Sequence, residues 1–250
     1  MLKVCLTSGC KGGTGKSTLA VLLTILYSGA GKRTILIDTG AGGNSSHIII
    51  TNPPPPYLRN IINDGDAIEA IIKCELSIKD KTVDFYLIPN DGPLHSVNNN
   101  SVRKLLKSIE KFFDIAIFDL PAYQNGEYNS FIDNCDIVLL IYNPSDFIIK
   151  AVSKCYTGNR IVIPVLNKHL GIEKYLVNIR KIHNSVFTIP FDPYLSIMNP
   201  GNLSNVLARI SSQAQKNLVE LALKIATMKK GFDKKVSKVS LLKVNTILRR

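Results

Sequence analysis

A short segment near the N-terminus reads K-G-G-T-G-K-S-T from Lys11 to Thr18 and contains the residue types that bind phosphate groups. Glycine allows successive backbone N–H groups to turn inward around phosphate oxygens, and the positive end of a following helix strengthens the attraction. In such a loop Lys16 would reach the β- and γ-phosphates of a nucleotide, and the Ser17 hydroxyl would coordinate Mg²⁺. The predicted nucleotide-binding residues of the loop are Gly12, Gly13, Thr14, Gly15, Lys16, Ser17 and Thr18.

The predicted loop lies between a strand and a helix, which is the context that phosphate binding requires. Lys3–Thr7 is a short apolar run typical of a buried strand, and Lys16–Ser28 is a longer, largely apolar run typical of a helix. The generic pattern G-x-x-x-x-G-K-[ST] would need a glycine where Cys10 stands, whereas the deviant pattern K-G-G-x-G-K-[ST] is matched at every position. A glycine-rich turn that binds nothing is the alternative, and the strand–loop–helix order favours nucleotide binding over it.

Strand-like and helix-like segments alternate along the chain, which is typical of βαβ units. The expected strands, mostly continuous apolar runs as in strands covered on both faces, are Lys3–Thr7, Thr34–Asp38, Asp84–Ile88, Ile115–Asp119, Ile137–Tyr142, Arg160–Leu166 and Val186–Ile189. The expected helices are Lys16–Ser28, Ala67–Lys73, Val102–Phe112, Lys174–His183 and Leu203–Lys230. We therefore predict an α/β fold with a doubly wound, mostly parallel sheet and helices on both faces, which would bind its ligand where the strands end.

The length of 250 residues is enough for one domain with its own core. We predict a P-loop domain over residues 1–228, followed by a basic tail over residues 229–250. No run approaches 18 uninterrupted apolar residues, so we expect no transmembrane helix. The first strand leaves no room for a signal peptide, so we expect a cytoplasmic protein. The five cysteines include no C-x-x-C pair, which argues against a structural zinc site or a disulfide framework.

Positive charge is concentrated in the last part of the chain. The formal net charge is +12, and residues 229–250 contain eight Lys or Arg residues against Asp233 alone. The expected helix Val102–Phe112 is a second basic feature, and its apolar residues, Phe112 among them, would face the sheet. Its basic residues are Arg103, Lys104, Lys107 and Lys111. A solvated surface is the plain alternative, but the overall basic balance favours binding of a polyanion, either nucleic acid or an anionic membrane.

The deviant loop resembles that of the ParA/MinD group of ATPases. Shorter motifs in the family's order extend this resemblance over about residues 1–225, and the order and spacing make the set specific although each later motif is weak alone. The later motifs are T-I-L-I-D at Thr34–Asp38, G-N at Gly43-Asn44, F-D-I-A-I-F-D-L-P at Phe113–Pro121, I-P-V-L-N-K at Ile163–Lys168 and I-P-F-D at Ile189–Asp192.

The resemblance implies ATP and Mg²⁺ as ligands and a role for each matching residue. Lys11 would cross a dimer interface to touch the partner's nucleotide, and it would form the catalytic group together with Lys16 and Asp38. Asp119, at the end of the strand similar to the family's Walker B strand, would join Ser17 on the Mg²⁺ side. The implied nucleotide contacts outside the loop are Asn167 and Pro190.

One departure from the family pattern affects the hydrolytic step. The family usually carries a second acid two residues after the first, and that acid helps to position the attacking water. This chain reads Asp38-Thr39-Gly40, so the carboxylate is absent. General-base or water-positioning groups contribute about 10²–10⁴-fold in rate. We therefore expect binding of nucleotide and Mg²⁺ to survive, while hydrolysis is slow or uses another group.

The predicted function is an ATP-dependent dimerising switch of the ParA type that binds DNA without sequence preference and acts in plasmid or chromosome partition. The homodimer would form on ATP binding, and a DNA-bound adaptor protein would stimulate hydrolysis. A MinD-like ATPase on an anionic membrane is an alternative, weakened because the apolar residues of the tail do not form one helical face. A hydrolysis-impaired nucleotide switch is another, raised by Gly40. A cofactor-maturation ATPase or reductase would need paired cysteines, which the sequence lacks.

Overall fold

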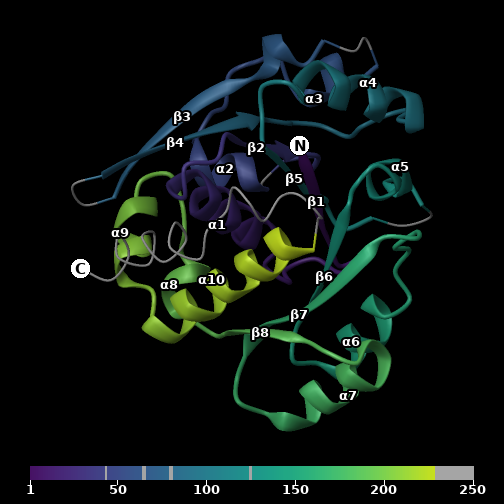
Figure 1. Cartoon of the computed structure of the whole chain (residues 1–250), viewed down its shortest axis with the longest axis vertical. Coiled ribbons are helices and arrows are strands. Elements are labelled where there is room, and N and C mark those ends of the chain that lie inside the picture. Colours follow the sequence, from purple (N-terminus) through teal and green to yellow (C-terminus); the bar gives the residue numbers. More distant parts are fainter. Residues whose placement is uncertain (43, 64–65, 79–80, 124–125, 229–250) are drawn as a thin grey trace.

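The computed structural model describes residues 1–42, 44–63, 66–78, 81–123 and 126–228, so the predicted basic tail lies outside the described residues. The described strands form one eight-stranded sheet (Figure 1). They are β1 Leu2–Thr7, β2 Thr34–Asp38, β3 Ile72–Ile78, β4 Lys81–Ile88, β5 Ile115–Asp119, β6 Ile137–Tyr142, β7 Ile161–His169 and β8 Phe187–Pro190. Their order across the sheet is β3-β4-β2-β5-β1-β6-β7-β8, and every neighbouring pair except β3–β4 is parallel.

Helices connect the parallel strands, and none in the described part of the chain is both long and apolar enough to cross a membrane. They are α1 Lys16–Gly29, α2 Ser45–Ile49, α3 Leu58–Ile61, α4 Asn99–Ile109, α5 Asn129–Asp133, α6 Asp146–Val152, α7 Glu173–His183, α8 Pro193–Ser196, α9 Leu203–Arg209 and α10 Ser212–Thr227. A short 3₁₀ helix spans Ile68–Ala70.

Helices cover both faces of the sheet, as predicted (Figure 1). The strands β2, β5 and β6 are buried along their whole length, which is why their sequences are continuous apolar runs. One core layer lies between the sheet and α1, α9 and α10, and the other lies between the sheet and α3 to α7. In the first layer the buried Tyr27 hydroxyl of α1 donates to the Ala222 carbonyl of α10 at 2.7 Å, which joins the two helices inside the core.

The predicted helix Ala67–Lys73 is wrong. The 3₁₀ helix is followed almost at once by β3, which pairs with β4 as an antiparallel edge strand. Apolar and polar residues alternate along β3, and Cys74 and Ile78 on its apolar side are buried. A period of two is the pattern of a strand with one covered face, and an antiparallel pair needs only a tight connection.

The basic helix α4 is displaced toward the N-terminus relative to the predicted Val102–Phe112. The Asn98 side chain caps its first turn by accepting two backbone N–H bonds, at 2.9 and 3.1 Å, so the helix starts at residue 99. It ends at Ile109, which leaves Lys111 beyond the helix. Phe112 is 50% exposed, so the prediction that its side chain faces the sheet is wrong.

The predicted helix Leu203–Lys230 is two helices, α9 and α10. The chain breaks at Ile210 and Ser211, where the Ser211 N–H donates to Asp192 Oδ2 at 2.7 Å. The Ser211 hydroxyl then accepts from the Ala214 N–H at 3.3 Å and caps α10. The break between α9 and α10 therefore depends on Asp192, which lies 19 residues before Ser211 in the sequence.

Candidate phosphate-binding site

The predicted phosphate-binding loop connects β1 to α1 and lines a cavity of about 480 Å³. All the predicted loop residues from Gly12 to Thr18 line this cavity, which opens where the central parallel strands end. Gly13 and Gly15 have φ values of 68° and 89°, in the left-handed region that glycine adopts without strain. Since α1 begins directly after Gly15, the unpaired N–H groups of its first turn belong to the loop.

The Lys16 ammonium is folded back into the loop. Its Nζ donates to the Ser8 hydroxyl at 2.9 Å and to the Lys11 carbonyl at 3.3 Å, and the residue is only 6% exposed. Burial lowers the pKa of Lys16, and the nearby Asp119 partly opposes this effect. A buried cation bonded to neutral oxygens gains from an anionic partner, and a phosphate oxygen is such a partner.

The two predicted carboxylates lie side by side at the ends of adjacent strands. Asp38 ends β2 and Asp119 ends β5, and the two residues are paired in the parallel register. Both are buried. Asp38 accepts backbone N–H bonds from Gly40 at 2.9 Å and from Ser46 at 2.8 Å. Burial raises the pKa of Asp38; burial and the neighbouring Asp38 raise the pKa of Asp119 to about 7.

The donor set around Asp119 fits a divalent cation. Its Oδ2 accepts from the Ser45 N–H at 3.3 Å, but its buried Oδ1 has no hydrogen-bond partner among the described residues. An unpartnered buried carboxylate oxygen costs free energy, which a cation would offset. The nearby Ser17 side chain partly opposes the rise in the pKa of Asp119, so both predicted Mg²⁺ residues lie together. Mg²⁺ typically uses one or two such protein oxygens together with substrate phosphates.

Asn167 and Pro190, the predicted nucleotide contacts outside the loop, line the same cavity. The Asn167 amide donates to the Thr14 carbonyl at 2.8 Å, and the Lys168 ammonium donates to the Gly13 carbonyl at 2.9 Å. Two consecutive side chains at the end of β7 thus hold the loop in place. The family resemblance implies that the Asn-Lys pair formed by Asn167 and Lys168 contacts adenine. The bond from Lys168 to the loop was not predicted.

Lys11 lies outside the set of residues that line the cavity. Its ammonium is 3.9 Å from the centroid of the Phe147 ring in α6, a cation–π contact, and Phe147 is 70% exposed. The predicted crossing of Lys11 to a second subunit therefore stays a prediction.

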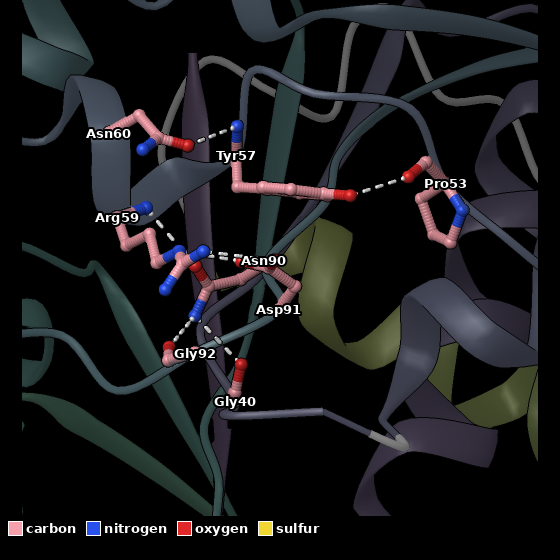
Figure 2. Close-up of polar contacts among 8 residues, drawn as sticks. All are labelled: Gly40, Pro53, Tyr57, Arg59, Asn60, Asn90, Asp91 and Gly92. Atoms are coloured by element: carbon pink, nitrogen blue, oxygen red, sulfur yellow. Dashed lines mark hydrogen bonds and ion pairs between the residues drawn. The ribbon is translucent and has the colours of Figure 1, made fainter.

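Asn90 fixes the switch segment that follows β2, and sequence analysis missed it (Figure 2). Its Nδ2 donates to the carbonyls of Gly40 and Gly92, both at 2.7 Å, and its Oδ1 accepts from the Arg59 N–H at 3.0 Å. Asn90 is 1% exposed, so these bonds are shielded from water. The position of Asn90 just after β4 could have indicated a role at the site, because the parallel strands of such a sheet end at the edge where the ligand binds.

The amino-acid sequence matches known proteins over most of its length. The AAA domain family model matches residues 2–186, more than half of the chain. The septum site-determining protein MinD of Bacillus subtilis is 26% identical over 186 residues, which cover 72% of this chain. The match spans 65% of that relative's length, which is less than two thirds.

Two solved structures have the same fold. MinD from Pyrococcus horikoshii in complex with Mg-ADP gives a TM-score of 0.68 at 18% identity, covering 92% of this chain and 99% of that one. The pNOB8 ParA bound to nonspecific DNA gives a TM-score of 0.60 at 15% identity, covering 74% of this chain and 76% of that one. At these identities the likeness shows the fold alone.

Proposed function

Because the chain belongs to the ParA/MinD family of ATPases, we propose that it is an ATP-dependent dimerising switch that acts on DNA in plasmid or chromosome partition. The observation that carries this proposal is the buried Lys16 ammonium in a cavity lined by the phosphate-binding loop. The nearby Asp119 has a buried Oδ1 without a hydrogen-bond partner among the described residues. A fixed cation, backbone N–H groups and an oxygen ligand for Mg²⁺ are what a bound triphosphate requires.

The residues of the site suit ATP and Mg²⁺ as ligands. Lys16 would exchange its bonds to Ser8 and to the Lys11 carbonyl for bonds to phosphate oxygens. The Ser17 hydroxyl and Asp119 would hold Mg²⁺, which when bound neutralises charge on the phosphates. Asn167 and Pro190 would contact the part of the nucleotide outside the loop.

Dimerisation would use Lys11, which is half-buried and lies outside the cavity. An exposed cation–π contact such as the one with Phe147 contributes about 0.5–1 kcal/mol. A hydrogen bond to a charged phosphate contributes about 1.5–3 kcal/mol. A partner's nucleotide would therefore outcompete the Phe147 ring for Lys11, and ATP binding would favour the dimer.

Nucleotide binding is tested by Lys16→Ala in the full-length chain. We expect this variant to lose detectable ATP affinity in equilibrium binding, because the cavity loses its buried cation. Lys216→Ala, on the exposed side of α10, is the matched control and should bind ATP like the wild type. Unchanged ATP affinity in Lys16→Ala would contradict the assignment of the loop.

DNA is the polyanion that we propose, and the net charge of +12 supports it. The described structure adds the exposed residues Arg103, Lys104 and Lys107 on α4. We expect random duplex DNA to be retained in the presence of ATP, with an affinity that falls steeply as salt rises. Deletion of residues 229–250 should weaken this binding. Charge reversal at Lys104 and Lys107 would measure how much of the affinity for DNA depends on α4.

The relationship to MinD provides the second candidate, an ATPase that acts at an anionic membrane surface. Cosedimentation with vesicles of phosphatidylglycerol and phosphatidylcholine tests it under the same conditions. Retention by these vesicles, together with no salt-sensitive binding of duplex DNA, would replace the partition proposal with this one.

A further inference from the structure

Two of the five cysteines line a second cavity beside the phosphate-binding loop. Cys10 directly precedes Lys11 at the start of the loop, and Cys155 follows the end of α6. This cavity also has a volume of about 480 Å³, but its lining differs from that of the cavity formed by Gly12 to Thr18. Cys10 is exposed and Cys155 is half-buried, so solvent reaches both residues.

The Cys155 sulfur packs against the loop at the residue next to Cys10. A methyl group built on Gly9 would lie 2.4 Å from Cys155 Sγ, so a residue without a side chain is needed there. Consecutive Cα atoms are 3.8 Å apart, and the Cα atoms of a disulfide are usually about 4.4–6.8 Å apart. Burial, followed by the neighbouring Cys10, raises the pKa of Cys155 to about 11. Contact with Gly9 and the influence of Cys10 both place the two thiols close together.

Hydrogen bonds hold the backbone on both sides of this thiol pair. The Lys11 N–H donates to the Ser8 carbonyl at 3.1 Å, which closes a four-residue turn around Cys10. The Cys155 N–H donates to the Val152 carbonyl of α6 at 3.0 Å. The two sulfurs can therefore meet chiefly by rotation of the Cys10 side chain, without a large movement of either segment.

We propose that hydrogen peroxide converts Cys10 and Cys155 to a reversible disulfide that ties the phosphate-binding loop to the end of α6. The Cys10 sulfur attacks one peroxide oxygen, the O–O bond breaks, and the other oxygen leaves as water. The Cys155 sulfur then bonds to the sulfur of the Cys10 sulfenic acid, and its proton leaves with the hydroxyl group as a second water. The two thiols lose two electrons and two protons, which reduce the peroxide. Cys10 reacts first because it is exposed, whereas the raised pKa keeps Cys155 as the thiol.

The consequence of this bond for the loop rests on the proposed function. Lys11 directly follows Cys10, and its ammonium contacts Phe147 near the start of α6. A disulfide to Cys155 would hold the segment that carries Lys11 against the same helix. The oxidised protein should therefore lose ATP-dependent dimerisation, because Lys11 stays with its own subunit. Dithiothreitol should restore dimerisation by thiol–disulfide exchange.

The first test treats the folded, full-length protein with hydrogen peroxide and maps its peptides by mass spectrometry without reduction. We expect a linked peptide that joins Cys10 to Cys155 and that disappears with dithiothreitol. Cys155→Ala should leave a sulfenic acid on Cys10, which dimedone traps, whereas Cys10→Ser should leave Cys155 as a free thiol. Cys74→Ala is the matched control, since Cys74 is buried in β3, and it should give the same linked peptide as the wild type.

The second test compares reduced and oxidised protein by sedimentation with a nonhydrolysable ATP analogue. The oxidised wild type should remain monomeric, and peroxide-treated Cys10→Ser should sediment like the same variant without peroxide. Absence of the linked peptide, a bond that joins two protein molecules, or unchanged dimerisation of the oxidised wild type would overturn the inference. A reduced protein that does not dimerise with nucleotide would refute the proposed function, while the linked peptide would still decide whether the disulfide forms.

Discussion

Replacing Asn90 with alanine should destabilise the protein far more than the loss of one surface amide would. The substitution removes three hydrogen bonds, to Gly40, Gly92 and Arg59, and leaves two carbonyls and one N–H without these partners (Figure 2). At about 1 kcal/mol for each bond, the expected loss in the free energy of unfolding is about 3 kcal/mol. In a chain of this size that corresponds to a fall in Tm of about 6–12 °C.

Urea unfolding of the nucleotide-free protein measures this loss, and Asn60→Ala is the matched control. Asn60 lies in the same region but is exposed, and its side chain accepts a single bond from the Tyr57 N–H at 3.0 Å (Figure 2). The control should lose less than about 0.5 kcal/mol. If the Asn90 variant loses no more than the control, the claim that Asn90 holds the switch segment is refuted.

Three further predictions follow from contacts elsewhere in the structure. Lys11→Ala should retain monomeric ATP binding but lose ATP-dependent dimerisation in sedimentation with a nonhydrolysable analogue; normal dimerisation would exclude the crossing role. Tyr27→Phe removes a buried hydrogen bond between α1 and α10 and should cost about 1 kcal/mol in urea unfolding, so an unchanged midpoint would contradict the role of this bond. Because the folded state raises the pKa of Asp119 to about 7, it keeps a proton that the unfolded state releases above about pH 4. The free energy of unfolding of the ligand-free protein should therefore fall between about pH 4 and pH 7, and by less in Asp119→Asn; parallel pH profiles would contradict this assignment.

The parallel core of the fold could be predicted because its signals are local. Buried strands such as β2 and β5 are nearly unbroken apolar runs. The loop before α1 has a glycine-rich, lysine-containing sequence that is typical of phosphate binding. The edge strand β3 was missed because its alternation covers only seven residues and directly follows a helical turn. The break before α10 was missed because it depends on Asp192, which no local pattern connects to Ser211.

The same distinction applies to the candidate site. The loop residues and the acids that end β2 and β5 could be identified from motifs within single segments. The positioning side chains could not, because their partners lie far away in the sequence: Asn90 is 50 residues from Gly40, and Lys168 is 155 residues from Gly13. Asn44 belonged to a recognised motif, but only the structure shows that its amide fills the space beside Gly40.

The helices cover opposite faces of the sheet, and this arrangement limits how a long polyanion such as the proposed DNA could contact the protein. Helix α4 packs on one face of the sheet, while α10, which leads into residues 229–250, packs on the other (Figure 1). The basic residues of α4 and the attachment point of the basic tail are thus separated by the thickness of the sheet. One straight duplex cannot lie flat against both. Contact of one duplex with both regions would have to follow a path around the edge of the sheet. Otherwise each face would engage a separate duplex, and the protein would join two DNA segments together.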